Sequence, residues 1–327
     1  MKKKIAAGID IGGTNTRIGL VDDSGNVLAD NNIATDKYPS VEDYVATMYN
    51  SIEILMKNPD MEEMELIGIG IGAPNANSRT GRIENAVNLP WHNVPLADMF
   101  RKYYGDIMIK ITNDANAVAI AEMVYGNAKD CTDFVVITLG TGLGSGIVAN
   151  GKMIDGHDGL AGEVGHITAV PDGRQCNCGR YGCLETYVSA PGLVRTALEL
   201  LVISNEKTGK NSLLRQVSFK DLTSKYVYEA AGKGDSIAKE AFNITGKILG
   251  RCLADVVAFS SPSAIFIFGG LADSKEMILD PVKKYMEEYM LSCYKNKVQI
   301  RPSGLDNNTA GIVGGAALIW NEYIKED

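Results

Sequence analysis

The sequence predicts an α/β fold of two duplicated domains, each built on a mixed β-sheet, and three observations support this prediction. The chain has 327 residues, 45% of them hydrophobic and 22% charged, which is enough apolar material for two ordinary cores. Apolar runs typical of buried strands alternate with segments of helical periodicity. A pattern of strand, Gly/Thr turn, strand, tight turn and strand begins near residue 3 and again near residue 133, and Gly140 lies 128 residues after Gly12. Two unrelated hairpins would also fit, but the shared turn chemistry at that spacing favours a duplication.

The first half of the sequence is expected to alternate strands with helices. Residues 3–34 are predicted to form three strands, separated by a Gly12-Gly13 turn and by a tight turn at 23–26. The elements expected next are a helix over 41–57, a strand over 66–71, a helix over 95–104, a strand over 107–112 and a helix over 115–125.

The second half begins with another strand pair and is then mainly helical. Residues 133–148 are predicted to form two strands around a glycine-rich turn, followed by a hairpin turn at Asn150-Gly151. Apolar residues spaced three and four apart from Ile237 to Val256 predict one long amphipathic helix. A strand over 264–268 and a small-residue-rich helix over 310–324, which should pack closely on a neighbour, complete the order. No Pro- or Ser-rich linker separates the halves, so the domains are expected to meet across a cleft.

The charge of the chain disfavours several classes of partner. The formal net charge is -8 and no basic stripe stands out, so neither nucleic acid nor an anionic membrane is an expected partner. The apolar stretch after Met1-Lys2-Lys3-Lys4 reaches Asp10 at once, without a cleavage pattern. No run approaches the roughly 20 apolar residues that span a bilayer. A cytoplasmic location is therefore expected.

Three glycine turns follow buried strands, and each is suited to bind part of a nucleotide. In Asp10-Ile-Gly12-Gly13-Thr14, backbone N–H groups and the Thr14 hydroxyl can donate to a phosphate, while Asp10 would face the metal of a Mg²⁺-nucleotide. Gly140-Thr141-Gly142-Leu-Gly144 is the counterpart in the second half, and Gly269-Gly270 would let an adenosine lie against the backbone. One such turn is more often only a turn, but the three together predict a site for ATP and Mg²⁺.

Asn113 and Asp114 follow the strand predicted over 107–112 and precede a helix. Both residue types are favoured as helix N-caps, which is the structural interpretation of this pair. The functional interpretation makes Asp114 a general base that accepts the proton of a hydroxyl nucleophile during phosphoryl transfer. Beside two phosphate-binding turns we favour the base, and a capping role is compatible with it.

One histidine and three cysteines lie within a segment of 18 residues and are predicted to bind a structural Zn²⁺ in a closed, four-coordinate site. The four candidates are His166, Cys176, Cys178 and Cys183. In a reducing cytosol, such a cluster indicates a metal rather than disulfides. A reduced Cys-rich turn and a nucleic-acid zinc knuckle are the alternatives. Glu163, Glu185 and the acidic balance of the chain oppose the knuckle.

Together these motifs resemble the ROK family (repressors, open reading frames and kinases) of the actin/hexokinase-like ATPase superfamily, over essentially the whole chain. The segment from Glu163 to Glu185 is similar to the family signature residue for residue. By this resemblance Asp114 is the catalytic base and Asn113 a sugar ligand. The resemblance also implies that sugar hydroxyls are held by Asn88, Glu163, His166 and Glu185. One ring nitrogen of His166 would bind zinc and the other would face the sugar.

The sequence departs from the family pattern at two positions. Pro74-Asn75 stands where kinases of the family usually carry Pro-Gly, and Ser145 stands where a further glycine is frequent. The resemblance further implies a smaller domain of 1–114 plus 303–327, a larger domain of 115–302, a C-terminal helix that crosses back to the first domain, and a homodimer.

The resemblance implies an enzyme that transfers the γ-phosphoryl group of ATP to a hexose 6-hydroxyl, with glucose expected first. N-acetylmannosamine, N-acetylglucosamine, mannose and fructose are alternative substrates. A sugar-responsive repressor is the main rival function, but such repressors carry a helix-turn-helix before the ATPase-like domain, and nine residues precede Asp10 here. A sugar sensor without kinase activity is disfavoured by the phosphate-binding turns and by Asp114.

Overall fold

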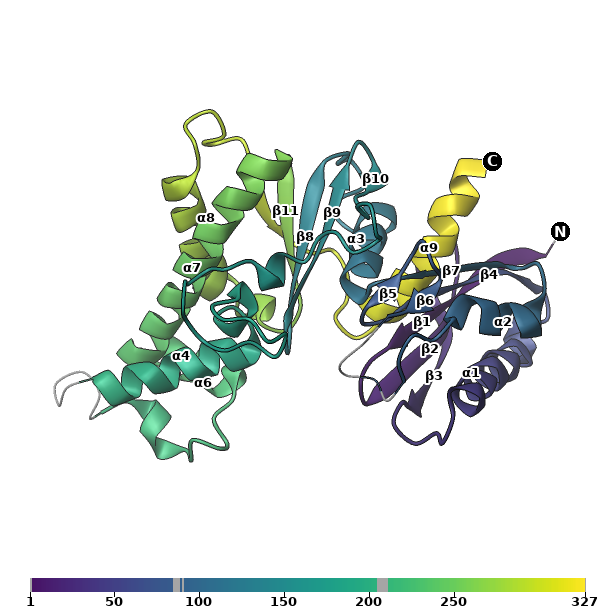
Figure 1. Ribbon diagram of the computed structural model, residues 1–327, viewed down its shortest axis with the longest axis horizontal. Coiled ribbons are helices and arrows are strands. Elements are labelled where there is room, and N and C mark those ends of the chain that lie inside the picture. The colour runs from purple at the N-terminus through teal and green to yellow at the C-terminus, as the bar shows by residue number, and fades with distance from the viewer. Residues whose placement is uncertain (1, 85–88, 90, 205–210, 327) are drawn as a thin grey trace. The chain divides into compact units, whose positions relative to one another are not determined.

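A computed structural model describes residues 2–84, 89, 91–204 and 211–326 of the chain. Within these residues it contains two five-stranded sheets, one short two-stranded hairpin and the helices that cover them (Figure 1). The long elements lie where the sequence patterns predict them.

The first sheet has the strand order β3-β2-β1-β4-β7. The pairs β1–β2 and β2–β3 are antiparallel, whereas β4 lies parallel to β1 and β7 lies parallel to β4. This sheet is therefore mixed. Its strands are β1 (Lys3–Ile11), β2 (Asn15–Val21), β3 (Val27–Ala34), β4 (Met64–Gly72) and β7 (Met108–Thr112).

The second sheet repeats this arrangement, with the order β10-β9-β8-β11-β12. Here too the second strand follows the first through a glycine turn, the third follows by a tight turn, and two parallel strands are added on the other side of the first. The shared order confirms the predicted duplication of mixed sheets. The strands are β8 (Phe134–Leu139), β9 (Leu143–Ala149), β10 (Lys152–Met153), β11 (Ala264–Phe268) and β12 (Gln299–Pro302).

The helices that the structure describes are α1 (Val41–Met56), α2 (Leu96–Tyr104), α3 (Asp114–Val124), α4 (Ala190–Ile203), α6 (Ser224–Gly232), α7 (Ser236–Ser260), α8 (Glu276–Tyr289) and α9 (Ala310–Glu326). Five of these helices, α1, α2, α3, α7 and α9, agree closely with the predicted ranges, and α4, α6 and α8 lie in the region predicted only as mainly helical. Two short strands that the sequence patterns did not predict, β5 (Ala76–Asn77) and β6 (Arg82–Ile83), form a hairpin in the loop after β4. The predicted Asn150-Gly151 turn joins β9 to β10, and both of its residues have positive φ.

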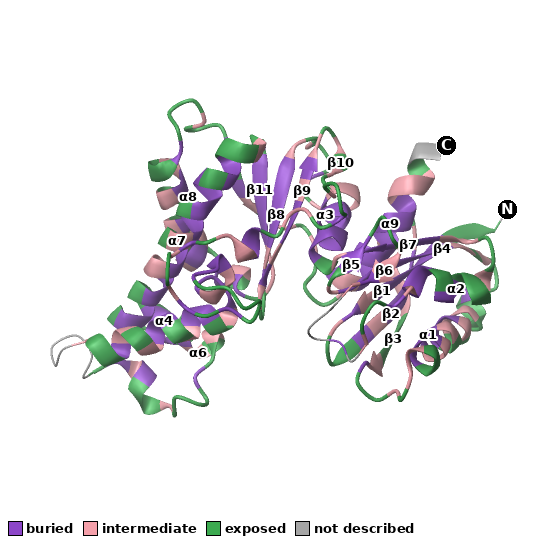
Figure 2. Cartoon of the chain, viewed as in Figure 1, coloured by how far each residue is buried: buried purple, intermediate pink, exposed green. Residues whose placement is uncertain are grey.

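The two faces of the first sheet are covered by different helices. Alternate residues of a strand point to opposite faces, so Ile5 and Ile9 of β1 join the buried cluster that includes Tyr44 and Met48 of α1. Ala6 of β1 instead joins a cluster with residues of α9. Buried residues accordingly concentrate along β1, β2 and β4 of this sheet (Figure 2).

The C-terminal helix lies with its backbone directly on the first sheet. A Cβ atom added at Gly8 would lie 1.8 Å from the carbonyl oxygen of Ile312, and one added at Gly70 would lie 1.9 Å from that of Gly315. Any side chain at these two strand positions would displace α9, so glycine is required there. The expected return of the small-residue-rich helix to the first sheet is confirmed.

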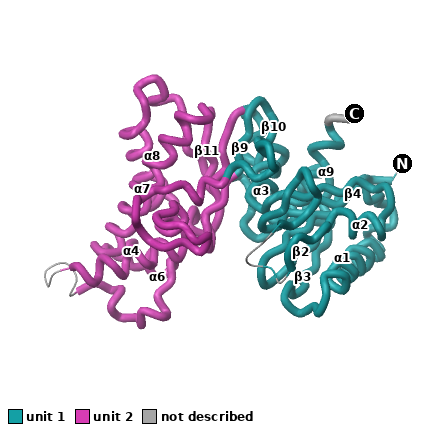
Figure 3. Tube along the Cα trace, in the orientation of Figure 1, with its two compact units in different colours: residues 1–132, 146–162, 303–327 teal, residues 133–145, 163–302 magenta. Residues whose placement is uncertain are grey.

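The chain divides into two compact units (Figure 3). The first contains residues 1–132, 146–162 and 303–327, and the second contains residues 133–145 and 163–302. The domain boundaries expected from the sequence, 1–114 with 303–327 and 115–302, remain a prediction, because compact units need not coincide with duplicated domains. Of the helices that the structure describes, none has both the length and the apolar character needed to cross a membrane.

Candidate active site

The first glycine turn joins β1 to β2 in the first unit. The N–H of Gly12 donates to the carbonyl oxygen of Asn15 at 2.9 Å, which closes the turn. Gly13 and Thr14 at its tip are exposed to solvent. The turn therefore exposes main chain and Thr14 to solvent, where a ligand can reach them.

Asp10 lies just before this turn and is half-buried. A Cβ atom added at Gly311, near the start of α9, would lie 2.1 Å from an Asp10 carboxylate oxygen, so the helix backbone approaches this carboxylate closely. Burial raises the pKa of Asp10 to about 6. The nearby charge of Asp114 adds to this shift, and Arg17 opposes it. A carboxylate in these surroundings favours a cation as its partner.

Asp114 is the first residue of α3, at the end of β7 in the same unit. The Asn113 side chain caps the helix by accepting from the N–H of Ala115 at 2.9 Å, and Asp114 accepts from the same N–H at 2.8 Å. The side chain of Asp114 is open to solvent. Desolvation by the protein around it raises its pKa, against the lowering effect of the Ala115 hydrogen bond. Asn113 thus supplies the cap, which leaves one carboxylate oxygen of Asp114 available for another partner.

The second glycine turn, in the second unit, joins β8 to β9. Gly140 donates through its N–H to the carbonyl oxygen of Gly142 at 3.0 Å, and Gly144 donates to the Thr138 hydroxyl at 3.1 Å. The N–H of Leu143 donates to a carboxylate oxygen of Glu185 at 3.2 Å. A residue predicted to bind the sugar therefore contacts a turn predicted to bind phosphate.

Gly269 belongs to the same region of the second unit. Its φ is 101°, which favours glycine, and an added Cβ would lie 2.6 Å from the carbonyl oxygen of Leu139 at the end of β8. A groove with a volume of about 500 Å³ begins at Thr141 and is lined by α4 and by the start of α6, including Val194, Leu198 and Leu222. This apolar groove beside a glycine turn has the character of a base-binding site.

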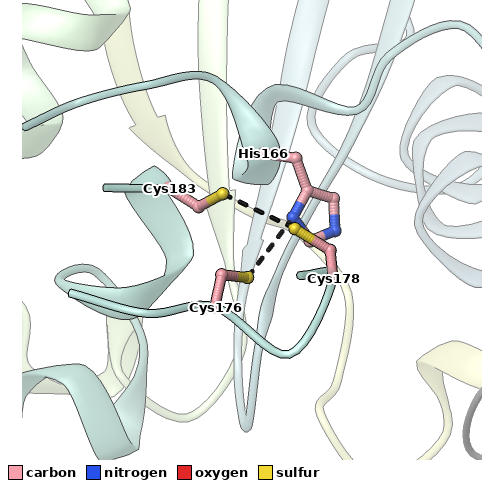
Figure 4. Close-up of side chains that lie close together, drawn as sticks. All are labelled: His166, Cys176, Cys178 and Cys183. Atoms are coloured by element: carbon pink, nitrogen blue, oxygen red, sulfur yellow. Dashed lines mark hydrogen bonds between the residues drawn. The ribbon is translucent and has the colours of Figure 1, made fainter. Parts of the chain in front are cut away.

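The four predicted metal ligands come together in the second unit, with their side chains pointing toward one another (Figure 4). Their ligand atoms all lie within 4.8 Å of each other. The sulfurs of Cys178 and Cys183 are 3.7 Å apart, as are the Cys176 sulfur and Nδ1 of His166. Ligand atoms about 2.0–2.3 Å from a tetrahedral zinc would be separated by about 3.5–3.8 Å, so the residues fit this metal.

The three thiols differ in how readily they ionise. Burial raises the pKa of Cys176 to about 12 and also raises that of Cys183. Burial has the same effect on Cys178, but the N–H of Arg180 and the neighbouring thiols outweigh it, so the pKa of Cys178 is lowered. Three thiolates this close together need a dication to compensate their charge.

The cluster of candidate metal ligands lies against the second glycine turn. Glu163 precedes the short helix η2 (Val164–His166), His166 is the last residue of that helix, and Glu185 lies in η3 (Leu184–Thr186). A Cβ added at Gly165 would lie 2.2 Å from the carbonyl oxygen of Leu143, so η2 packs on the start of β9. With Nδ1 of His166 facing the sulfurs, Nε2 is the nitrogen left for another partner.

The two departures from the family pattern have physical explanations. Asn75 has φ of 52°, the left-handed conformation that glycine adopts most easily and that asparagine tolerates better than most residues. The backbone conformation is therefore compatible with either residue. Ser145 accepts through its hydroxyl from the N–H of Val164 at 3.2 Å and so ties β9 to η2. Asn88 lies outside the described residues.

A buried arginine beside the metal-ligand loop and a buried glutamate in α3 were not predicted. The side chain of Arg174 is 5% exposed, and its guanidinium donates to Glu199 at 2.6 Å and to the carbonyl oxygens of Thr186 and Gly192. It thereby joins both ends of the Cys176–Glu185 loop to α4. Glu122, fully buried in α3, accepts from the N–H groups of Asn127 and Gly304.

Two mixed sheets of the same strand order, each with a glycine turn after its first strand, define the actin/hexokinase-like class of ATPases. The sequence profile of the ROK family matches residues 6–322. The chain belongs to the ROK family.

Relatives of the chain include both kinases and regulators. A glucokinase of Halalkalibacterium halodurans is 33% identical over 321 residues, 98% of this chain and 96% of that protein. The crystal structure of a ROK family glucokinase from Streptomyces griseus in complex with glucose and AMPPNP has a TM-score of 0.79 and 33% identity, covering 96% of this chain and 98% of that one. A DNA-binding transcriptional dual regulator of Escherichia coli is 28% identical, over 96% of this chain but 75% of its own length.

Proposed function

We propose that this protein is an ATP-dependent hexose kinase whose first substrate is glucose. The observation that carries the proposal is the similarity, at 33% identity and a TM-score of 0.79 over 96% of this chain, to a glucokinase whose structure holds glucose and AMPPNP. The chain retains the parts such a reaction needs: two glycine turns, an accessible carboxylate at a helix start, and polar side chains around a metal cluster.

Asp114 acts as the general base in this proposal. Its carboxylate accepts the proton of the sugar 6-hydroxyl as that oxygen bonds to the γ-phosphorus of ATP, and the bond to the β,γ-bridging oxygen breaks to release ADP. A raised pKa makes this carboxylate a better proton acceptor near neutral pH than an ordinary aspartate. The hydrogen bonds of Asn113 and Ala115 hold its backbone in place.

The glycine turns hold ATP. The N–H of Gly13 and the Thr14 hydroxyl in the first turn, and the N–H groups of Thr141 and Gly142 in the second, donate to phosphate oxygens. Asp10 holds Mg²⁺, which neutralises charge on the phosphates when bound. The adenosine lies against Gly269-Gly270, and the groove that begins at Thr141 supplies apolar surface for the base.

The cluster of His166 and the three cysteines holds a structural zinc that orients the sugar ligands. With Nδ1 on the metal side, the imidazole keeps one tautomer and turns Nε2 toward a sugar hydroxyl. Glu163 and Glu185, on the two segments that carry the metal ligands, accept from further hydroxyls. Asn88 and Asn113 complete the proposed set of sugar ligands.

The test is an ADP-release assay coupled to a panel of hexoses and N-acetylhexosamines. We expect the highest kcat/KM with glucose, and lower values with mannose, fructose, N-acetylglucosamine and N-acetylmannosamine. A different preferred sugar would correct the substrate and keep the kinase. ATP binding without phosphorylation of any sugar would contradict the proposal and favour a sugar-responsive regulator, which the similarity to the Escherichia coli regulator makes the second candidate.

Two finer properties belong to the same proposal. A homodimer is expected from membership of the family, and sedimentation velocity tests it. A cytoplasmic location follows from ATP as a substrate and from the need to keep Cys176, Cys178 and Cys183 reduced.

A further inference from the structure

Three buried hydroxyl groups lie beneath the first glycine turn. Thr16 belongs to β2, Thr35 follows β3, and Tyr44 lies in the first turn of α1, and none of them is more than 1% exposed. The Thr16 and Thr35 hydroxyl oxygens are 2.8 Å apart, and the Tyr44 hydroxyl is hydrogen-bonded to Thr16. The Thr35 hydroxyl donates to the carbonyl oxygen of Gly12 at 2.8 Å.

The hydrogen bonds in this group can run in only one direction. A carbonyl oxygen accepts and never donates, so the single hydroxyl hydrogen of Thr35 is committed to Gly12. Thr16 must then donate to Thr35, and Tyr44 must donate to Thr16. The three hydroxyls form a directed chain that ends at the glycine turn, and each bond polarises the next.

This chain of three hydroxyl groups is held in place at both of its ends. Thr35 also donates through its backbone N–H to the carbonyl oxygen of Thr14 at 2.8 Å, so one residue binds the turn on both sides of Gly13. The Tyr44 ring is stacked on Trp91, with 4.6 Å between the ring centroids and 27° between the planes. Its hydroxyl therefore has little freedom to turn away from Thr16.

We propose that Tyr44, Thr16 and Thr35 are positioning residues that prepare the N–H of Gly13 to bind a phosphate oxygen of ATP. The carbonyl of Gly12 and the N–H of Gly13 belong to one planar trans peptide, so a carbonyl held toward the buried Thr35 directs the N–H the opposite way. A hydrogen bond at the carbonyl also polarises the peptide and strengthens its N–H as a donor. The inference rests on the proposed function, in which phosphate binds at Gly12–Thr14.

The same hydroxyls could instead serve only the stability of the fold, and the molecule offers matched controls for that alternative. Among the residues that the structure describes, two buried hydroxyls have no hydrogen-bond partner: Thr245 in α7 and Tyr125 after α3. Thr245→Val and Tyr125→Phe therefore make the same chemical changes as Thr35→Val and Tyr44→Phe, without removing a hydrogen bond.

The experiment measures the dissociation constant of AMPPNP by calorimetry and the KM values for ATP and glucose, in the full chain with its metal. We expect Thr35→Val to weaken AMPPNP binding and raise the ATP KM by about 10-fold, the effect of roughly 1.4 kcal/mol. Tyr44→Phe, two bonds further from the turn, should cost about 3-fold by the same reasoning. The glucose KM should change less than about 2-fold by that scale, and Thr35→Ser, which keeps the hydroxyl, should restore AMPPNP binding.

Equal AMPPNP affinity in Thr35→Val and Thr245→Val would overturn the inference, as would equal losses for AMPPNP and glucose. If Thr35→Val does not fold, the graded pair of Tyr44→Phe and Tyr125→Phe decides the question. Failure of the wild type to bind AMPPNP at all would instead reject the proposed function, so the two failures are distinguishable.

Discussion

The two glycine turns have the same position in their sheets, and each accepts a hydrogen bond at the carbonyl of its first glycine, but they differ in how their N–H groups are used. The first is held through its carbonyl groups: Thr35 donates to Gly12 through its hydroxyl and to Thr14 through its N–H. The second also accepts at a carbonyl, because Ala190 donates through its N–H to Gly140 at 2.9 Å, and in addition the N–H of Leu143 donates to the Glu185 carboxylate. Neutral donors support the first turn, whereas an anion occupies a donor of the second.

The two turns therefore differ in which of their N–H groups can donate to a phosphate. In the first turn the N–H of Gly12 closes the turn, and donation to the Gly12 carbonyl directs the N–H of Gly13 away from the buried hydroxyls. In the second turn, the Glu185 carboxylate competes with a phosphate for the Leu143 N–H, and Glu185 also lies 3.5 Å from the sulfur of Cys176 in the metal cluster. We therefore expect changes at the first turn to affect ATP alone and changes around the second turn to affect both substrates.

The largest effect is expected at Asp114, the proposed catalytic base, which belongs to neither glycine turn. Asp114→Asn should lower kcat by roughly 10²–10⁴-fold, because the variant has no carboxylate to accept the proton. Binding of glucose and AMPPNP should persist, since the Asn113 cap remains. Rapid-quench kinetics measures the chemical step, and near-normal turnover would remove Asp114 from the mechanism.

Loss of the metal tests the sugar side of the second unit. Cys178→Ala should lose stoichiometric zinc in elemental analysis and raise the glucose KM by about 10–100-fold, the usual cost of disturbing a metal site. The affinity for AMPPNP should change much less, with folding checked by circular dichroism. Cys293→Ala, at an exposed cysteine outside the cluster, is the control. A wild type without zinc, or a zinc-free variant with normal glucose binding, would contradict the coupling.

A matched pair of glycine substitutions distinguishes the turns directly. Gly13→Val should weaken AMPPNP binding and leave glucose binding nearly intact. A Cβ at Gly142 would lie 2.5 Å from a carboxylate oxygen of Glu185, so Gly142→Val should displace that side chain and weaken both ligands. Calorimetric titration with each ligand separately measures the two losses. If Gly142→Val spared glucose as Gly13→Val should, the link through Glu185 would be wrong.

The smallest effect concerns Asp10 and pH. The folded protein binds the Asp10 proton more tightly than the unfolded chain, because burial raises the pKa to about 6. Stability is therefore lost as the pH rises from about 4 to above 6 and the buried carboxylate ionises. Without nucleotide, Asp10→Asn should melt about 2–5 °C higher than the wild type at pH 8, with no difference below about pH 4. Equal melting temperatures at pH 8 would show that Asp10 is not destabilising.

Elements with a periodic pattern could be predicted from the sequence, and so could sites whose residues lie close together in the chain. The helix predicted from Ile237 to Val256 forms within α7, and the strand over 264–268 forms at those residues. His166, Cys176, Cys178 and Cys183 lie near one another in sequence, so their residue types and spacing were enough to predict that they cluster.

Contacts between residues far apart in the chain left no such signal. Thr16, Thr35 and Tyr44 come from three elements and have no common spacing, and each alone is an ordinary core residue. The bond from Leu143 to Glu185 spans 42 residues and depends on how η2 and η3 pack on β9. Such contacts arise from tertiary packing, which local patterns do not encode.

The most direct test of the central claim compares glucose with 6-deoxyglucose in the presence of ATP labelled at its γ-phosphoryl group. If Asp114 takes a proton from the 6-hydroxyl, the label should move to glucose in amounts equal to the ADP formed, and none should move to 6-deoxyglucose. Transfer of label to 6-deoxyglucose would contradict phosphorylation at the 6-hydroxyl, and retention of all label on ATP with both sugars would contradict the assignment as a glucose kinase.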